Sequence, residues 1–300
     1  MQNIKHICFI TPNYPTNEEP VYTFVRELIC AIADMGVKCS VIAPVSITKT
    51  FIRKTKKRES FWHDITEKGN KINIYQPRMV SFSNIRLFGL SVSGFIRQVT
   101  ILKTYEKIKI KPDVLYGHFW ANGLIAGIIG EKNNIPVFVA TGESKINIQH
   151  IYPKRLLKKH LANVRGVICV SAKNKEESLE LGLASQDIMT VIPNAINNKI
   201  FFPMDKDFAR EKLGYKKDDF IIAYTGAFSH RKGVMRLSEA VKSIENTKVL
   251  YIGSGELKPD EKNALFIGRL SHSQIPLYLN AADVFVLPTL AEGCSNSIIE

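Results

Sequence analysis

Short apolar runs alternate along the chain with segments whose apolar residues recur every three or four positions. The runs predict strands over 5–11, 38–43, 71–78, 113–117, 136–140, 166–170 and 188–192. The periodic segments predict helices over 20–35, 92–110, 121–133, 153–164 and 173–182, and residues 44–70 are expected to be a long polar and basic connection. Continuous apolar strands that alternate with helices indicate a parallel sheet covered on both faces.

A second series of the same kind follows a polar stretch, 193–219, that contains two prolines and a short helical piece at 207–213. Strands are predicted over 220–225, 247–252, 264–267 and 283–287, with helices over 233–244 and 273–280. The pattern therefore predicts an α/β protein of two doubly wound domains, 1–205 and 206–300. Since such sheets bind ligands at the carboxyl ends of their strands, we expect the site in the cleft between them. Residues 295–300 read as the first turn of a helix, so we expect the second domain to be incomplete.

Composition narrows the class of protein. The chain has 300 residues, of which 45% are apolar and 23% charged, and this is typical of a globular protein. Its apolar runs are shorter than the roughly 18 residues of a membrane span, and its start shows no secretory signal. Five scattered cysteines have no metal-ligand spacing, so we expect a cytoplasmic protein with reduced thiols.

The net charge of +13 is unevenly distributed, because residues 1–205 carry 28 Lys and Arg against 16 Asp and Glu. Three clusters stand out: Lys49, Arg53, Lys54, Lys56, Lys57 and Arg58; Lys103, Lys107, Lys109 and Lys111; and Lys154, Arg155, Lys158 and Lys159 on a predicted amphipathic helix. Basic residues beside Phe51, Phe61 and Trp62 suit an anionic membrane surface. A solvated basic face of no specific role is an equally weighted interpretation, and nucleic acid is a weaker one because no nucleic-acid motif is present.

The segment Gly226-AFSHRKG follows a predicted strand and opens a helix at Gly233. Arg231 and Lys232 then lie at the amino end of that helix, where free N–H groups, the helix dipole and two cations favour a diphosphate. The alternative is an ordinary strand-to-helix turn with solvated charges.

The segment Ala282-DVFVLPTLAEGCSNSIIE places Glu292 in a loop after a buried strand and Glu300 in the first turn of the next helix. Carboxylates in these places suit sugar hydroxyls and a ribose diol, and Ser295 and Asn296 start a helix whose N–H groups can face phosphate oxygens. Alternatively, Ser297-x-x-Glu300 is a capping box and Glu292 is an exposed loop acid.

His118 ends a predicted strand, where it can contact a sugar or assist proton movement, or simply be a loop histidine with a backbone partner. The loop from Thr11 to Tyr22 follows the first strand and is expected to face a ligand. No dinucleotide fingerprint, Walker lysine motif or zinc-protease motif occurs.

Taken together, these segments resemble the retaining glycosyltransferases of family 4, which have the GT-B fold of two facing Rossmann-like domains. The likeness covers essentially the whole chain. Ala281-ADVFVLPTLAEGCSNSIIE is similar to the family's E-x7-E region, Val191-IPNAINNKIFFP to its interdomain segment, Val167-ICVSAKNKEE to a strand and helix start, and Ile252-GSGE to a glycine-rich turn. Ala227 departs from the family, which has an arginine after the glycine of this loop, and Tyr116 replaces the first histidine of the "HAH" element.

The resemblance implies roles for individual residues. On the donor side it implies that the diphosphate sugar is bound by Gly226, Arg231, Lys232, Glu292, Ser295, Asn296 and Glu300. On the acceptor side it implies contacts from Asn17, Glu18, His118, Thr141 and Gly142, although Asn17-EEPVY and Thr141-GES differ from the family's loops. His118 and Glu292 lie nearest the reacting centre, Asn194 is structural, and no metal or other cofactor is expected.

The function so implied is transfer of a sugar, with retention, from a nucleotide-diphosphate sugar to a glycan or lipid-linked acceptor in surface polysaccharide synthesis. The expected partners are the nucleotide sugar, the acceptor and an anionic membrane surface at the inner face of the cytoplasmic membrane, but no nucleic acid. Two alternatives remain: a non-catalytic nucleotide-sugar-binding protein, and a nucleotide-sugar epimerase of the same fold.

Overall fold

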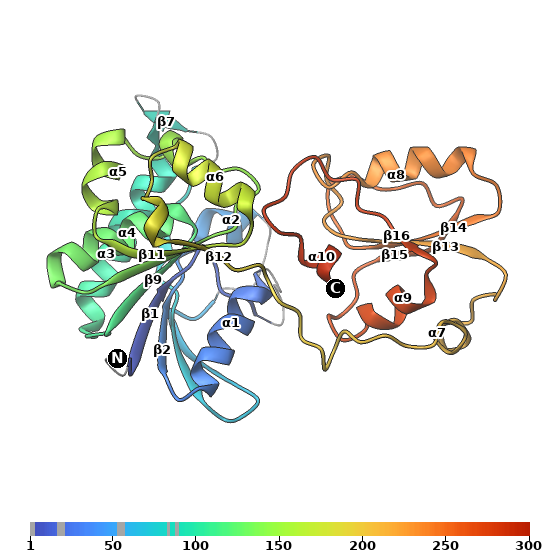
Figure 1. The fold of residues 1–300 in the computed structure, drawn as a ribbon, viewed down its shortest axis with the longest axis horizontal. Coiled ribbons are helices and arrows are strands. Elements are labelled where there is room, and N and C mark those ends of the chain that lie inside the picture. Colours follow the sequence, from blue (N-terminus) through green and yellow to red (C-terminus); the bar gives the residue numbers. More distant parts are fainter. Residues whose placement is uncertain (1–3, 17–21, 53–57, 83–84, 88–89) are drawn as a thin grey trace. The chain divides into compact units, whose positions relative to one another are not determined.

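The computed structural model describes residues 4–16, 22–52, 58–82, 85–87 and 90–300. The chain forms two compact units, Met1–Ile192 and Pro193–Glu300, each built on its own parallel sheet (Figure 1). The prediction of an α/β protein with doubly wound sheets is therefore confirmed.

The sheet of the first unit has eight strands in the order β12-β11-β10-β9-β1-β2-β5-β4. These are β1 (His6–Ile10), β2 (Lys38–Ile42), β4 (Phe61–Ile65), β5 (Lys71–Tyr75), β9 (Val114–His118), β10 (Val137–Thr141), β11 (Val164–Cys169) and β12 (Met189–Val191). From β1 the chain first adds strands on one side, where β2, β5 and the edge strand β4 lie. It then adds β9, β10, β11 and β12 in turn on the other side of β1. The order therefore reverses between β1 and β9, and the ligand crevice of a doubly wound sheet lies at such a point.

The remaining elements of this unit are helices and short strands. The helices are α1 (Thr23–Asp34), α2 (Ile47–Ile52), α3 (Val92–Ile108), α4 (Trp120–Asn133), α5 (Lys154–Leu161) and α6 (Ala172–Glu180), with 3-10 turns at Ile148–His150 and Gln186–Ile188. The short strands are β3 (Val45–Ser46) paired with β6 (Arg78–Met79), and β7 (Arg86–Leu87) paired with β8 (Leu90–Ser91).

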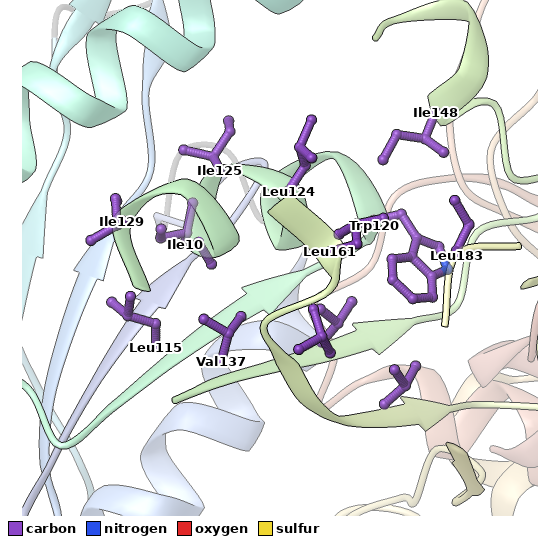
Figure 2. Close-up of a cluster of buried hydrophobic side chains, with 14 of the residues drawn as sticks. Ile10, Leu115, Trp120, Leu124, Ile125, Ile129, Val137, Ile148, Leu161 and Leu183 are labelled. Carbon is purple, nitrogen blue, oxygen red and sulfur yellow. The ribbon is translucent and has the colours of Figure 1, made fainter. Parts of the chain in front are cut away.

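Two apolar cores cover the two faces of this sheet because successive strand residues point to opposite sides. Cys8 and Ile10 of β1 point to the face covered by α3, α4 and α5, whereas Phe9 points to the face covered by α1 (Figure 1). Figure 2 shows the larger core, in which Trp120, Leu124, Ile125 and Ile129 of α4 lie against Leu115 and Val137 of the sheet.

The prediction for 44–70 was wrong, because this stretch holds β3, α2 and β4. β4 is the antiparallel edge strand of the large sheet, and its residues alternate between exposed and half-buried. An edge strand that is only half covered needs no continuous apolar run, so the criterion that found the central strands missed it.

The second unit has a four-stranded parallel sheet in the order β15-β14-β13-β16. Its strands are β13 (Phe220–Thr225), β14 (Thr247–Ile252), β15 (Ala264–Gly268) and β16 (Val284–Phe285). Its helices are α7 (Lys206–Leu213), α8 (Val234–Ala240), α9 (Ile275–Ala281) and α10 (Asn296–Ile299), with a 3-10 turn at Val241–Ser243. α8 covers one face and α7 and α9 the other (Figure 1), and the strand order reverses between β13 and β16.

The boundary between the units differs from the predicted one. Residues 193–205 were assigned to the first domain, but they belong to the second unit. The backbone N–H of Met204 donates to Oδ1 of Asn280 at 2.8 Å, Nδ2 of Asn280 donates to the carbonyl of Phe202, and the Phe201 ring lies edge-on to His272. These contacts fix the polar segment on the second unit, which its composition alone does not indicate.

Candidate functional site

Two loops of the second unit lie side by side at the point where its strand order reverses. One runs from Gly226 to Gly233 after β13, and the other runs from Leu287 to Glu292 after β16, which pairs with β13. The N–H of Leu290 donates to the carbonyl of Arg231 at 2.9 Å, and Oγ1 of Thr289 lies 3.2 Å from the same carbonyl. The sheet topology thus brings together two segments that are about sixty residues apart in the chain.

A carboxylate surrounded by cations lies between these loops. Oε1 of Glu292 is 2.8 Å from Nζ of Lys232 and 3.0 Å from Nη1 of Arg231, and it accepts a hydrogen bond from Oγ1 of Thr289 at 2.7 Å. Nη1 of Arg231 also donates to the carbonyl of Ala291 at 2.7 Å. The sequence analysis selected Arg231, Lys232 and Glu292 for separate reasons, and the fold brings their charged groups into contact.

The environment of Glu292 keeps it ionised. Partial burial by itself raises the pKa of this carboxyl group, but the hydrogen bonds from Lys232 and Thr289 and the charges of Lys232 and Arg231 outweigh burial and hold the pKa below its usual value. Arg231 is the most exposed of the three charged residues, while Lys232 and Glu292 are mostly covered. The cluster is therefore charged, and the side chain of Arg231 is its part most accessible to solvent.

Two glycines near this cluster lie so close to neighbouring backbone carbonyls that no side chain would fit in their place. Gly233 has φ +81°, and a Cβ there would lie 2.1 Å from the carbonyl oxygen of Pro288. The N–H of Gly226 donates to the carbonyl oxygen of Ile252 at 3.0 Å. A Cβ on Gly253 would lie 1.9 Å from the carbonyl oxygen of Gly226. The turn that was quoted as Ile252-GSGE thus supports the loop after β13.

Arg236, in the first turn of α8, clamps the two loops and was missed by the sequence analysis. Its Nε and Nη2 donate to the carbonyl of Pro288 at 3.1 and 2.7 Å, and Nη2 donates to the carbonyl of Arg231 at 3.2 Å. The guanidinium therefore touches both loops through their backbone carbonyls. No sequence signal marks this role, because an arginine inside a helix is ordinarily a solvated residue.

The residues at α10 are held by neighbours within their own unit. Oδ1 of Asn296 accepts a hydrogen bond from Nδ2 of Asn194 at 2.7 Å, which agrees with a structural role for Asn194. Ser295 is buried, and its Oγ has no hydrogen-bond partner in the described part of the chain. Glu300 pairs with His272 at 3.1 Å. The alternative interpretation of a capping box is wrong, because the helix begins at Asn296 and Ser297 lies inside it.

In the first unit, His118 ends β9 beside the point where the strand order reverses. It is only 7% exposed, and its ring lies against Phe24 and Phe119, with centroids 5.5 and 4.7 Å away. Burial lowers the pKa of His118 to about 4, so the ring is neutral at physiological pH. Its Nδ1 has no hydrogen-bond partner among the described residues, which leaves one buried polar atom for a ligand.

A further residue on α3, Arg97, is connected to His118 through Asn122. Nε of Arg97 donates to Oδ1 of Asn122 at 3.3 Å, and Nδ2 of Asn122 donates to the carbonyl of His118 at 2.6 Å. Nη2 of Arg97 donates to the carbonyl of Thr11 at 2.7 Å, so both bonds of this guanidinium go to neutral oxygens. Arg97 thus ties the loop after β1 to the start of α4.

Thr141 and Gly142, expected on the acceptor side, both bond to Glu143. Oγ1 of Thr141 and the N–H of Gly142 donate to Oε2 of Glu143 at 2.6 and 2.9 Å, and the N–H of Trp120 donates to Oε1 at 2.8 Å. Burial raises the pKa of Glu143, and these hydrogen bonds oppose that shift. The sequence analysis quoted this residue only as part of a loop, and its role at the first turn of α4 comes from the structure.

The other two acceptor-side residues, Asn17 and Glu18, lie outside the described residues. The part of their loop that is described is fixed by β4. Oη of Tyr14 donates to Oδ2 of Asp64 at 2.7 Å, and Arg26 forms a two-bond ion pair with the same carboxylate at 2.6 and 3.0 Å. The strand that the sequence analysis missed therefore supplies the anchor of this loop.

Comparison with known proteins identifies the family. The profile described as Glycosyltransferase Family 4 matches residues 21–199, and the profile described as Glycosyl transferases group 1 matches residues 205–300. The chain belongs to glycosyltransferase family 4. It is accordingly a glycosyltransferase, and the family-4 resemblance suggested by its motifs is confirmed.

Two relatives show how far the similarity of this glycosyltransferase extends. The chain is 28% identical to "Putative teichuronic acid biosynthesis glycosyltransferase TuaC" of Bacillus subtilis, over 98% of this chain and 77% of the relative. It is 26% identical to "UDP-Gal:alpha-D-GlcNAc-diphosphoundecaprenol alpha-1,3-galactosyltransferase" of Escherichia coli, over 70% of this chain and 62% of the relative. The chain thus spans about three quarters of the first relative and less than two thirds of the second.

Solved structures establish the fold. Sucrose-phosphate synthase of Thermosynechococcus elongatus superposes with a TM-score of 0.72 at 17% identity, covering 97% of this chain and 77% of that one. HepE of Anabaena, solved in complex with UDP-glucose, superposes with a TM-score of 0.56 at 14% identity, covering 95% and 74%. The glycosyltransferase therefore has the GT-B fold, as expected.

No three His, Cys, Asp or Glu side chains of residues 4–16, 22–52, 58–82, 85–87 and 90–300 come together in an arrangement that could hold a metal ion. No helix within these same ranges is long and apolar enough to cross a membrane.

Proposed function

We propose that this glycosyltransferase moves a hexosyl-type sugar from a nucleotide-diphosphate sugar to a glycan or lipid-linked acceptor, with retention of the anomeric configuration. The observation that supports this most is the contact of Arg231 and Lys232 with Glu292 at the switch point of the second unit. Two cations and one carboxylate are what a diphosphate and the hydroxyls of a sugar require. The names of the two relatives, which refer to teichuronic acid biosynthesis and to a diphosphoundecaprenol acceptor, support a role in surface polysaccharide synthesis. The excess of Lys and Arg in residues 1–205 supports an anionic membrane as the place of that synthesis.

The chemistry of the donor determines what these side chains do. The bond that breaks joins the anomeric carbon to a phosphate oxygen, and negative charge develops on the departing diphosphate. Arg231 and Lys232 stabilise that charge, and the donor in turn separates them from Glu292, which then accepts hydrogen bonds from the sugar. The proposal includes the nucleotide sugar as donor substrate and no cofactor, because Arg231 and Lys232 stabilise the negative charge of the departing diphosphate.

The acceptor side follows from the family resemblance. The acceptor hydroxyl attacks from the face that the diphosphate leaves, and a phosphate oxygen of the leaving group takes the hydroxyl proton. His118 is neutral, so its Nδ1 serves as a hydrogen-bond partner of the sugar and not as a cationic acid. Thr141 and Gly142 shape the acceptor side through Glu143, together with Asn17 and Glu18 in the first loop.

Substitution at the charged cluster tests the proposal. Glu292→Gln and Lys232→Ala are each expected to lower the rate of sugar transfer at least about tenfold while leaving the fold intact, because each removes one contact to the donor. Glu261→Gln and Lys262→Ala are matched controls, since both residues are exposed in the same unit. Unchanged turnover in both cluster variants would refute the assignment of the site.

The donor is found first with a thermal-shift panel of UDP, GDP, ADP, CMP and their common sugars. A ligand at 100 times its Kd adds about 2.7 kcal/mol to the free energy of unfolding, which is a shift of several degrees. Release of a free epimer without any acceptor would show an epimerase, and donor binding without turnover would show a binding protein.

A further inference from the structure

Five large apolar side chains are exposed on one short segment of the first unit. Val80, Phe82, Ile85, Leu87 and Phe95 are between 42% and 63% exposed, and we call them the hairpin surface. Monomeric proteins rarely expose large apolar side chains together unless something covers them. In Figure 1 this segment includes β7, at the top of the first unit.

These side chains are held in place by hydrogen bonds of their own segment. Oγ of Ser93 donates to the carbonyl of Phe82 and accepts from its N–H, both at 2.8 Å. The N–H of Val92 donates to the carbonyl of Ile85 at 3.2 Å, and β7 pairs with β8 in antiparallel register. These bonds fix the described backbone of the segment, and its five apolar side chains are exposed.

The basic helix α5 begins beside this segment. Oη of Tyr152 donates to the carbonyl of Gly94 at 3.4 Å, and a Cβ on Gly94 would lie 2.5 Å from the side chain of Ile151. α5 starts two residues after Tyr152, buries Leu157 and Leu161, and exposes its basic residues. Those are Lys154, Arg155, Lys158 and Lys159, which we call the basic face of α5.

The two stretches of chain that carry these features contain basic but no acidic residues, and the acidic residue paired with α5 is Glu131 of α4, which lies 2.6 Å from His160. No Asp or Glu occurs from Lys68 to Tyr105, which includes the hairpin surface, and none occurs from Ser144 to Lys175, which includes α5. Arg78 and Arg86 are exposed among the apolar residues. A protein partner with an apolar face and mixed charges would gain little here, whereas a surface that is apolar inside and anionic outside matches both features.

We propose that the hairpin surface and the basic face of α5 together dock on an anionic lipid bilayer. The apolar side chains enter the boundary between headgroups and acyl chains, while the lysines and arginines contact anionic headgroups. This inference rests on the proposed function in one respect, because it places the enzyme where a lipid-linked acceptor is found. Lys54, Lys56 and Lys57 of the first basic cluster lie outside the described residues and are not needed for it.

Binding of the full chain to vesicles tests the proposal without any sugar substrate. Vesicles of phosphatidylcholine alone are compared with vesicles that hold equal parts of phosphatidylcholine and phosphatidylglycerol, at low and high salt. We expect binding to the mixed vesicles only, and a loss of binding as salt shortens the screening length to below about 10 Å.

Two double variants separate the apolar and the charged contributions. Leu87→Ser with Phe95→Ser is expected to lower the partition coefficient at least about tenfold. Lys154→Ser with Lys158→Ser is expected to lower it about fivefold per charge. Phe220→Ser with Ile244→Ser, and Lys216→Ser with Lys258→Ser, are controls at exposed residues of the second unit and are expected to bind as the parent does.

The possible results distinguish the proposal from the proposed function. Binding that ignores anionic lipid or salt, or that survives both hairpin and α5 variants, would overturn the docking surface. A change in oligomeric state of the hairpin variant without any vesicle binding would assign the surface to a second copy of the chain, which also overturns it. Sugar transfer to a water-soluble acceptor analogue needs no membrane, so the hairpin and α5 variants are expected to retain it. Absence of that transfer in the parent protein would count against the proposed function and not against the docking surface.

Discussion

The clamp made by Arg236 leads to a prediction that distinguishes positioning from simple stability. Arg236→Met removes three hydrogen bonds, two to the carbonyl of Pro288 and one to the carbonyl of Arg231. A charge-assisted bond contributes about 1.5–3 kcal/mol. Because the three bonds share two acceptors and the guanidinium is partly exposed, we take about 2 kcal/mol for the whole clamp.

That free energy holds the loop that carries Arg231 and Lys232 against the loop that carries Glu292. If the donor binds only when the loops are clamped, its apparent Kd rises in proportion to the loss of the clamped fraction. Since 1.4 kcal/mol corresponds to a factor of ten, a loss of about 2 kcal/mol raises the Kd by at most about 27-fold, and we expect a rise of about tenfold if the clamp is the main contact that holds the loops together. The expected result is therefore weaker donor binding from a residue that does not touch the donor.

Titration calorimetry with the nucleotide found in the thermal-shift panel measures this change. Arg236→Lys is expected to fall between the parent and Arg236→Met, because one ammonium cannot reach both carbonyls as a guanidinium fork does. Arg165→Met is the control, since Arg165 is exposed in the first unit. A donor Kd within twofold of the parent, together with a lower melting temperature, would show that the clamp stabilises the unit without positioning the site.

Three further predictions concern single residues. The pKa of His118 is about 4 in the folded protein and about 6.5 when unfolded, so only the unfolded state gains this proton between those values. Stability is therefore expected to fall by up to about 3 kcal/mol as pH drops from 6.5 to 4, and urea denaturation of His118→Gln over the same range should show a smaller fall. Arg210 is 1% exposed and donates to Oδ2 of Asp283 at 2.7 Å, so Arg210→Met is expected to lower the free energy of unfolding by about 3 kcal/mol in denaturant titrations. Asp64→Asn weakens the pairing with Arg26 that anchors the first loop, and we expect steady-state kinetics to show acceptor KM raised about fivefold and donor KM unchanged.

The clamp and the first-loop anchor join residues that are far apart in the chain, which is why no local pattern revealed them. Arg236 bonds to the carbonyl of Pro288, which is 52 residues away, and Asp64 accepts a hydrogen bond from Tyr14, which is 50 residues away. A carbonyl oxygen is the same in every residue, so a side chain that recognises carbonyls leaves no trace in the sequence of its partner. Such contacts exist only once the strands are in order.

The sequence by itself determined where most strands and helices lie and which charged residues stand at the ends of those strands and helices. Apolar runs and helical spacing depend on neighbours a few positions apart, which is why the central strands and most helices were predicted, and why the half-covered strand β4 was not. The same local information indicated Arg231 and Lys232 at a helix start and Glu292 after a strand. Only the tertiary structure decided that these residues meet, because β16 returns to the far side of β13 and reverses the strand order there. Strand order is set by long-range packing of both faces of the sheet, and no segment of the sequence holds that information alone.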